Sequence, residues 1–200
     1  MRRSLLLSGL LIASTGATAS PPAMPLEAGG RQAAVDYVAS TEAQRAVLFV
    51  AVMSPQTGMN RSMTLYGDGR LVLAELSASR EVIKERDLQL TAAESRDLLD
   101  LAINHRLAEY DETDVRAREL RGKTTSGAEG VFDAATTIAR IALDSYSRDG
   151  HVAENLEKEI QVYGVKQAAR SFPDIIEYQG LKALQDRLYE FWSSVGWPLW

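Results

Sequence analysis

The stretch SMTLYGDGRLVLAEL, residues 62–76, decides the fold of the first half of this chain. Two runs of β-compatible residues, 62–66 and 70–76, flank the glycine-rich segment Gly67-Asp68-Gly69. Glycine accepts the positive φ angles that tight hairpin turns require, and an aspartate between glycines stabilises a turn by bonding nearby backbone N–H groups. We therefore predict an antiparallel hairpin in which the Gly-Asp-Gly segment reverses the chain.

A calcium loop is the alternative for this turn. If Gly69 took the place of the invariant glycine of such a loop, four positions would have to supply oxygen ligands. These positions hold Thr64, Tyr66, Asp68 and Glu75. A tyrosine does not suit that cage, so the residues favour a plain turn, and no metal or cofactor is expected.

Strands are also predicted on both sides of this hairpin. Residues 46–53, AVLFVAVM, are apolar at every position, which is typical of a central strand covered on both faces. A second turn is expected at residues 77–80, and residues 81–90 are predicted as the next strand. The first half of the chain is thus expected to be a series of antiparallel strands.

A second hairpin is predicted further along the chain. From residue 132 the pattern is extended again, and one face of the strand would carry Thr137, Ala139, Ile141 and Leu143. The pair Asp149-Gly150 is typical of a tight turn, which we place at residues 148–151. Residues 152–162 then alternate as a strand, although Leu156, Ile160 and Tyr163 also fit a helix.

Two helices are predicted. The first begins after Thr91, which forms a capping box with Glu94. Its apolar face is made by Leu98, Leu99, Ala102 and Ile103. The second helix is approached through Pro173 and Gly180 and ends near Gly196, a typical C-terminal residue. Its apolar face is made by Leu181, Leu184, Leu188, Trp192 and Val195.

This order of elements predicts an α+β domain, with an antiparallel sheet built from hairpins and two main helices packed on one face. Residues 1–19 have the charged start, apolar core and small-residue cleavage site of a signal peptide. Residues 20–45, which are rich in proline and glycine at their start, are predicted to be a flexible leader. The single domain is then expected over residues 46–196, with an aromatic tail at 197–200.

The signal peptide predicts an exported protein that is periplasmic or extracellular after cleavage. The apolar core of this segment is far shorter than the roughly 20 residues that cross a bilayer, so no transmembrane segment is expected in the mature chain. Acidic residues outnumber basic ones by 27 to 22, which gives a net charge of −5. Such a charge opposes binding to nucleic acid, because phosphate backbones repel it.

The sequence also resembles a group of uncharacterised exported bacterial domains. The resemblance covers roughly residues 47–195, and its sharpest motif is the Tyr-Gly-Asp-Gly-Arg hairpin at 66–70. A further strand, a helix opened by a capping box, later strands and a closing amphipathic helix follow in the same order. The resemblance implies the fold and the exported location, and it provides no catalytic residues to transfer.

Few residues suit catalysis. The chain has no cysteine, which removes thiol chemistry and thiolate metal sites. Its only histidines are His105 and His151, and no G-x-S-x-G serine motif occurs. The segment Gly122-Lys123-Thr124 ends like a phosphate-binding loop, but Ala117 stands where that motif requires glycine.

Residues 108–130 are predicted to be a long connection without structure of its own, either a binding loop or mobile. Its first part is acidic, and Asp111 and Asp114 are candidate contacts for a partner or for calcium. Trp197 and Trp200 in the terminal WPLW are further candidate contacts for a partner, unless they fold back onto the core.

These observations favour a non-catalytic binding or interaction module of the cell envelope, whose partner is an envelope protein. The alternative is a hydrolase that acts on envelope polymers through two carboxylates. Such an enzyme requires two acids facing each other across a cleft, with the pKa of one of them raised. The oligomeric state is left open by the sequence.

Overall fold

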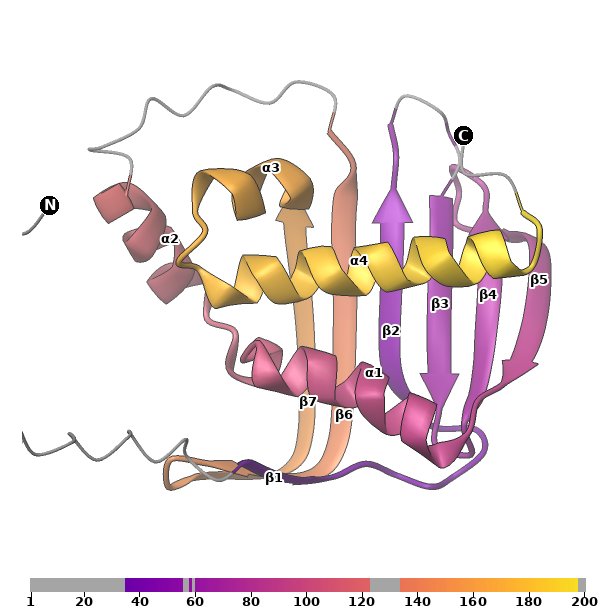
Figure 1. The fold of residues 1–200 in the computed structure, drawn as a ribbon, viewed down its shortest axis with the longest axis horizontal. Coiled ribbons are helices and arrows are strands. Elements are labelled where there is room, and N and C mark those ends of the chain that lie inside the picture. The colour runs from indigo at the N-terminus through magenta and orange to yellow at the C-terminus, as the bar shows by residue number, and fades with distance from the viewer. Residues whose placement is uncertain (1–34, 56–57, 59, 123–133, 198–200) are drawn as a thin grey trace, which may run out of the picture. The chain divides into compact units, whose positions relative to one another are not determined.

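Seven antiparallel strands form one sheet in the computed structural model, which describes residues 35–55, 58, 60–122 and 134–197. The strands lie in the order β1-β6-β2-β3-β4-β5, and β7 pairs with β6 as well (Figure 1). Their bounds are β1 (Val35–Val38), β2 (Ala46–Met53), β3 (Asn60–Tyr66), β4 (Arg70–Leu76), β5 (Val82–Gln89), β6 (Thr136–Arg148) and β7 (His151–Tyr163). Short turns connect consecutive partners, so the predicted hairpin sheet is confirmed.

The turn between β3 and β4 has the predicted geometry. Gly69 has a φ of +83°, and its N–H donates to the carbonyl of Tyr66 at 3.0 Å. The Asp68 carboxylate accepts the N–H of Arg70 at 3.0 Å, which is the turn-stabilising bond expected of an aspartate. Gly67 is required for another reason, because a Cβ there would lie 2.4 Å from the carbonyl oxygen of Ser40.

The turn between β6 and β7 is a two-residue loop. Asp149 and Gly150 have φ angles of +53° and +82°, which are typical of the primed turn that matches the twist of paired strands. The register is symmetric about this turn, from Arg148 opposite His151 to Thr136 opposite Tyr163. The segment after the turn is therefore a strand, and the helical alternative for it is wrong.

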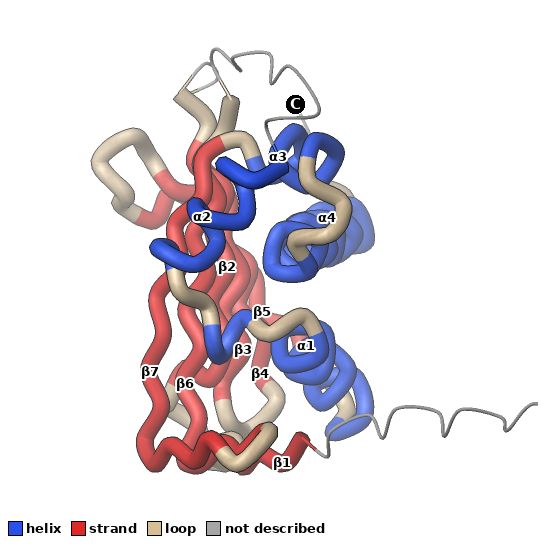
Figure 2. The backbone as a smooth tube through the Cα atoms, turned by 90° about the vertical axis from the view of Figure 1, so that its left-hand side faces the viewer, coloured by secondary structure: helices blue, strands red, loops and turns tan. Residues whose placement is uncertain are grey.

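The helices pack against the sheet, as Figure 2 shows, where α1 and α4 lie on one side of it. The helices are α1 (Ala92–Asn104), the short 3-10 helix η1 (Leu107–Glu109), α2 (Glu112–Gly122), α3 (Val165–Ser171) and α4 (Ile176–Ser194). The capping box of α1 is present, because Thr91 Oγ1 accepts the N–H of Glu94 and the Glu94 carboxylate accepts the N–H of Thr91. The predicted α+β class is thus confirmed.

One continuous core lies between the sheet and the helices. The predicted apolar faces of both helices are buried in it, as are alternate residues of the central strands. Burial of one large apolar side chain stabilises the fold by roughly 1.5–3 kcal/mol, so this layer supplies most of the driving force. The largest side chains that are almost fully enclosed include Leu48, Met63, Leu65, Leu71, Leu73, Ile141, Leu143 and Trp192.

The sequence analysis placed Gly180 ahead of the last helix, but Gly180 lies inside α4. A Cβ on Gly180 would lie 2.4 Å from the Cβ of His105 and 3.0 Å from its Cγ. The glycine therefore allows α4 to approach the end of α1 closely. The cost of a helical glycine, about 1 kcal/mol relative to alanine, is offset by this packing.

The prediction of an unstructured connection over residues 108–130 is wrong for its first part. Residues 107–109 form η1 and residues 112–122 form α2, while 123–130 lie outside the described residues. Only Val115 of α2 is buried, so this helix has no periodic pattern of apolar residues from which it could be predicted. The helix is held to α4 by a polar contact, in which the Arg118 guanidinium donates two hydrogen bonds of 3.0 and 2.6 Å to the Glu177 carboxylate.

The boundary between leader and domain also differs from the prediction at residue 46. Strand β1 pairs with β6 from Val35 opposite Arg148 to Val38 opposite Ser145. Tyr37 is buried, and its hydroxyl donates to Asp100 of α1 at 2.8 Å. The domain therefore includes residues 35–45 as well, and the rest of the predicted leader and the signal peptide lie outside the described residues.

Strand β6 reverses its inward face near its end. Thr137, Ala139, Ile141 and Leu143 are buried as predicted, but Tyr146 and Arg148 are buried as well. Opposite this point Asn155 has a φ of +52°, and the pairing skips from Leu143 to Ser145. The reversal lets Tyr146 donate to Glu109 and lets Arg148 donate to the carbonyl of Ile103 at 2.9 Å.

Candidate functional site

The outer face of the sheet, opposite α1 and α4, is the strongest candidate site (Figure 2). Side chains alternate along a strand, so on β2 Val50 and Val52 point toward the helices, whereas Phe49, Ala51 and Met53 point outward. The register places Phe49 between Arg140 of β6 and Thr64 of β3. Residues that lie far apart in the sequence thus meet on this face.

A row of residues with little exposed surface, three of them with short side chains, crosses the middle of the outer face. It runs over four neighbouring strands through Ile138, Ala51, Ser62 and Ala74, which we call the outer trough. These residues are only 7%, 1%, 3% and 7% exposed. Ala51, Ser62 and Ala74 are hidden because their side chains are short and larger neighbours stand on either side, and Ile138 ends the row on β6. A cavity of about 440 Å³ lies over the row.

The walls of the outer trough are largely apolar. The larger side chains that border this cavity include Phe49, Met53, Val72, Leu76 and Val82. Arg80 and Glu85 lie at its β5 end. An apolar depression with a few polar groups at its margins is the usual form of a binding site.

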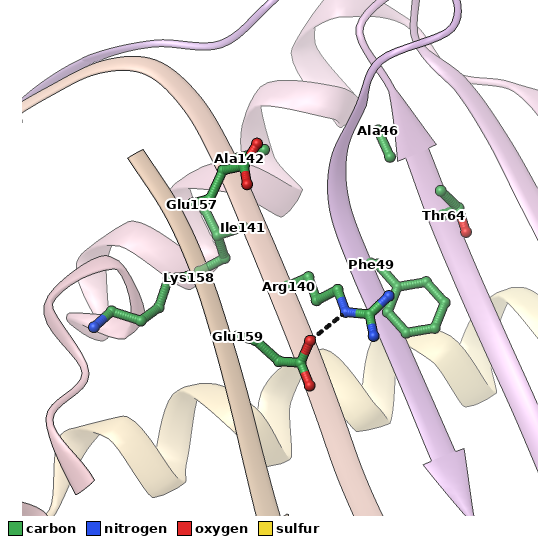
Figure 3. Close-up of a pocket in the computed structure, with 9 residues that line it drawn as sticks. All are labelled: Ala46, Phe49, Thr64, Arg140, Ile141, Ala142, Glu157, Lys158 and Glu159. Carbon is green, nitrogen blue, oxygen red and sulfur yellow. Dashed lines mark hydrogen bonds and ion pairs between the residues drawn. The ribbon is translucent and has the colours of Figure 1, made fainter. Parts of the chain in front are cut away.

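A second cavity of about 550 Å³ adjoins the first and shares Phe49, Thr64 and Arg140 with it. Figure 3 shows the Arg140 guanidinium between the Glu159 carboxylate of β7 and the ring of Phe49. Arg140 Nε lies 2.7 Å from Glu159 Oε2, and the guanidinium carbon lies 5.3 Å from the centre of the ring. Both charged side chains are more than half exposed, so the pair contributes at most about 1 kcal/mol to stability. Its position suits orienting a ligand better than holding the fold.

The acidic residues of this second cavity are Glu157 and Glu159, two positions apart on β7. They extend from the same side of one strand rather than facing each other across a cleft. A carboxylate hydrolase also needs an acid whose pKa is raised. The pKa shifts of Glu94, Glu109 and Asp111 all go downward. The hydrolase alternative therefore gains no support from these groups.

The predicted contact residues Asp111 and Asp114 both make contacts within α2 or at its start. The Asp111 carboxylate accepts the N–H groups of Asp114 and Thr113 at 3.0 and 2.8 Å, which caps the helix and holds the pKa of Asp111 below its usual range. Asp114 lies 3.0 Å from Arg118 Nε. Within the residues that the structure describes, no group of three or more acidic or histidine side chains could hold a metal ion.

Trp197 packs against the end of α4. Its ring meets Trp192 edge-on, with 4.6 Å between the ring centres, and only 7% of the residue is exposed. Lys84 Nζ lies 4.4 Å from the centre of the Trp197 ring. This packing leaves little of the Trp197 side chain for a partner, and Trp200 lies outside the described residues.

The calcium-loop alternative, the two histidines and the Gly122-Lys123-Thr124 segment can now be placed in the structure. In the hairpin, the calcium ligands would be spread along two strands, with Thr64 midway along β3 and Glu75 at the opposite end of β4 from the turn. The Nδ1 atom of His105 lies 2.7 Å from the carbonyl oxygen of Leu101, and His151 begins β7 beside its turn. Lys123 and Thr124 lie outside the described residues.

Comparison with known proteins gave no match, either to a protein-family model or to a curated protein. Among the residues described, no helix has the length and apolar character that crossing a membrane requires. The outer trough was missed by sequence analysis, because it depends on the register of four strands. The available signal was the alternation within residues 46–53, where Phe49, Ala51 and Met53 share one face.

Proposed function

We propose that this chain is a non-catalytic binding module of the bacterial cell envelope, and that it binds an amphipathic helix of an envelope protein on the outer face of its sheet. The observation that carries the proposal is the outer trough, in which the short side chains of Ala51, Ser62 and Ala74 lie between larger apolar ones. Short side chains let another backbone approach closely, and apolar walls favour burial of an apolar face.

A helix suits this surface because the inner face of the same sheet already accepts one across its strands. Figure 1 shows α4 crossing the strands at a steep angle. The outer trough crosses the strands as well, over three strand spacings or about 14 Å. About nine helical residues span that length, which is about two and a half turns. A bound helix would therefore make the sheet the middle of three layers.

Charged groups at the two ends of the trough suit orientation of such a helix. Arg140 and Glu159 stand at the β7 end, and Arg80 and Glu85 stand at the β5 end. Exposed pairs of this kind add little affinity, but they select the direction and register of a partner. The charged rim would thus provide specificity, and the apolar trough would provide affinity.

The envelope location rests on the signal-peptide pattern of residues 1–19 and on the resemblance to exported bacterial domains. Because the chain has no cysteine, its fold does not depend on the redox state of its compartment. Cell fractionation with N-terminal sequencing of the mature protein tests this part. Recovery from the cytoplasm with residues 1–19 intact would contradict it.

Photo-crosslinking in living cells tests the binding surface. A photoreactive phenylalanine analogue is placed at Val72, which borders the outer trough, and in a control protein at Val152, which is 65% exposed near the β6–β7 turn. We expect a discrete product only from position 72, and mass spectrometry should map it to an amphipathic helix of an envelope protein. Adding Ala51→Leu should fill the trough and remove the product.

Three outcomes would contradict this proposal. The first is equal crosslinking from positions 72 and 152. The second is a product that survives Ala51→Leu, and the third is a product that contains a lipid or a second copy of this chain. Circular dichroism of the Ala51→Leu protein shows whether its fold is retained. If that variant does not fold, Ala74→Ser tests the same trough by removing an apolar contact, and the product should then weaken.

A further inference from the structure

Strand β5 forms a free edge of the sheet within the described residues, because β4 is its only partner there. All of its side chains except Leu88 are exposed. Val82 and Ile83, near its start, are large apolar residues that are 56% and 63% exposed. A strand edge of this kind presents backbone N–H and C=O groups that another extended segment can pair with.

The charges of β5 are separated by sign onto the two faces of the strand. Lys84 and Arg86 share the helix side, where Lys84 Nζ lies over the ring of Trp197. Glu85 and Asp87 share the outer side, where Glu85 borders the cavity over the outer trough. The edge is therefore basic on one face and acidic on the other.

This separation opposes pairing between two copies of β5. In a two-fold antiparallel pair that continues the sheet, residues opposite each other lie on the same face. Lys84 and Arg86 would then meet the same basic residues of the second copy, and Glu85 and Asp87 would meet acidic ones. Like charges directly opposite each other destabilise a strand pair.

The other edge of the sheet opposes association in the same way. On β7, Glu157 and Glu159 are on the outer side, and Lys158 is on the side of the buried residue Ile160. If β7 of a second copy continued the sheet from β5, acids would again meet acids and bases would meet bases. Both edges thus carry a pattern that disfavours a second copy of this chain.

We propose that β5 binds an extended segment of another protein whose side chains alternate between acidic and basic. Its acidic side chains would lie beside Lys84 and Arg86, and its basic side chains would lie beside Glu85 and Asp87. Backbone hydrogen bonds would supply affinity, and Val82 with Ile83 would contact an apolar residue at one end. This site does not depend on a helix occupying the outer trough.

Synthetic peptides test the proposal. The probe is the labelled peptide Thr-Val-Lys-Glu-Lys-Glu-Val-Thr, which matches the eight residues of β5 in length. The composition control is Thr-Val-Lys-Lys-Glu-Glu-Val-Thr, in which the same charges are blocked together. In fluorescence anisotropy, the alternating peptide should bind about fivefold more tightly, because two charge pairs change from repulsive to attractive. N-methylation of its four charged residues should abolish binding, because the backbone donors are lost.

A charge variant of β5 locates the site. In Lys84→Glu/Arg86→Glu both faces of the strand are acidic, so the alternating peptide should lose most of its affinity and a peptide with four central lysines should gain affinity. The matched control, Arg116→Glu/Arg187→Glu, makes the same change in net charge on α2 and α4, away from β5. It should bind both peptides in the same order as the wild type does. Circular dichroism confirms that both variants fold.

The outcomes separate clearly. Equal binding of the alternating and blocked peptides would overturn the proposal, as would unchanged binding to the β5 variant. A lack of saturable binding by any peptide would also overturn it, and would mean that these charges only protect the edge. Binding by Ala51→Leu should equal that of the wild type, so failure of the helix site would not be confused with failure of this one.

Discussion

Replacing Gly180 by alanine should destabilise the protein, although the same change stabilises most helices. In an ordinary helix interior, alanine is favoured over glycine by about 1 kcal/mol. Here the added Cβ would lie 2.4 Å from the Cβ of His105. Both atoms are fixed to their backbones, so a rotamer change cannot relieve the contact and α4 must move away from the end of α1.

The size of the effect follows from two opposing contributions. Overpacking of this kind costs typically 1–3 kcal/mol, and shifting α4 also loosens its contacts with the sheet. Against this, the alanine restores about 1 kcal/mol of helix preference. We expect a net loss of about 1–2 kcal/mol in the free energy of unfolding, which corresponds to a melting temperature lower by roughly 2–8 °C for a domain of this size.

Urea denaturation followed by circular dichroism measures the change, and a double-mutant cycle identifies its cause. His105 follows the end of α1 as its C-cap, where glycine is well tolerated, so His105→Gly removes the clashing atom. In that background Gly180→Ala should be neutral or stabilising. A Gly180→Ala protein as stable as the wild type would refute the close approach of α1 and α4, and so would an equal loss in both backgrounds.

Three further predictions concern the caps, the charges and the edge. Thr91→Ala should lower the free energy of unfolding by about 1 kcal/mol, because the N–H of Glu94 loses its partner. Thr91→Ser should retain most of the wild-type stability, and a Thr91→Ala protein with an unchanged free energy of unfolding in urea denaturation would contradict the capping box. Burial raises the pKa of Glu109, but hydrogen bonds from Tyr146 and Arg106 outweigh it and hold the pKa below its usual range. The resulting stabilisation is present above the unfolded-state pKa of about 4.3 and is lost as the pH falls through the folded-state value, so the advantage of the wild type over Glu109→Gln should narrow in acid, and a widening gap would contradict the assignment. Changing residues 84–87 to threonine should cause concentration-dependent association in analytical ultracentrifugation, because the charges that oppose pairing of β5 with another strand are removed. A variant with the same association state as the wild type would show that these charges do not prevent edge-to-edge pairing.

Local signals were sufficient to predict the hairpins and the two main helices. Gly69 and Gly150 have the positive φ angles that their turns require, and the capping box at Thr91 determines where α1 begins. Helix α4 was predicted because apolar residues recur at helical spacing from Leu181 to Val195. In each case, the residues that determine the structure are close together in the sequence.

Helix α2 and strand β1 could not be predicted in this way, because distant residues hold them. Only one residue of α2 is buried, and the bidentate contact between Arg118 and Glu177 joins residues 59 positions apart. The one local signal was Asp111, which caps the helix ahead of acidic residues in its first turn. Strand β1 has four residues and gains its regular structure by pairing with β6.

The outer trough lay beyond sequence reasoning for a related reason. Each strand shows only that some outward residues are short, as with Ala51 on β2 and Ala74 on β4. These become one row only through the register of β2, β3, β4 and β6. A single shift by one residue in any pair would turn the short side chains to the other face.

The binding surface is tested most directly by nuclear magnetic resonance, with the methyl groups of alanine and leucine labelled. The crosslinked helix of the envelope protein is added as a synthetic peptide to the folded protein. Binding in the outer trough predicts that the methyl signals of Ala51 and Ala74 shift and saturate together, while those of Leu181 and Leu184, on the far side of the sheet, stay nearly unchanged. Saturating shifts at Leu181 and Leu184 without shifts at Ala51 and Ala74 would contradict a binding site on the outer face.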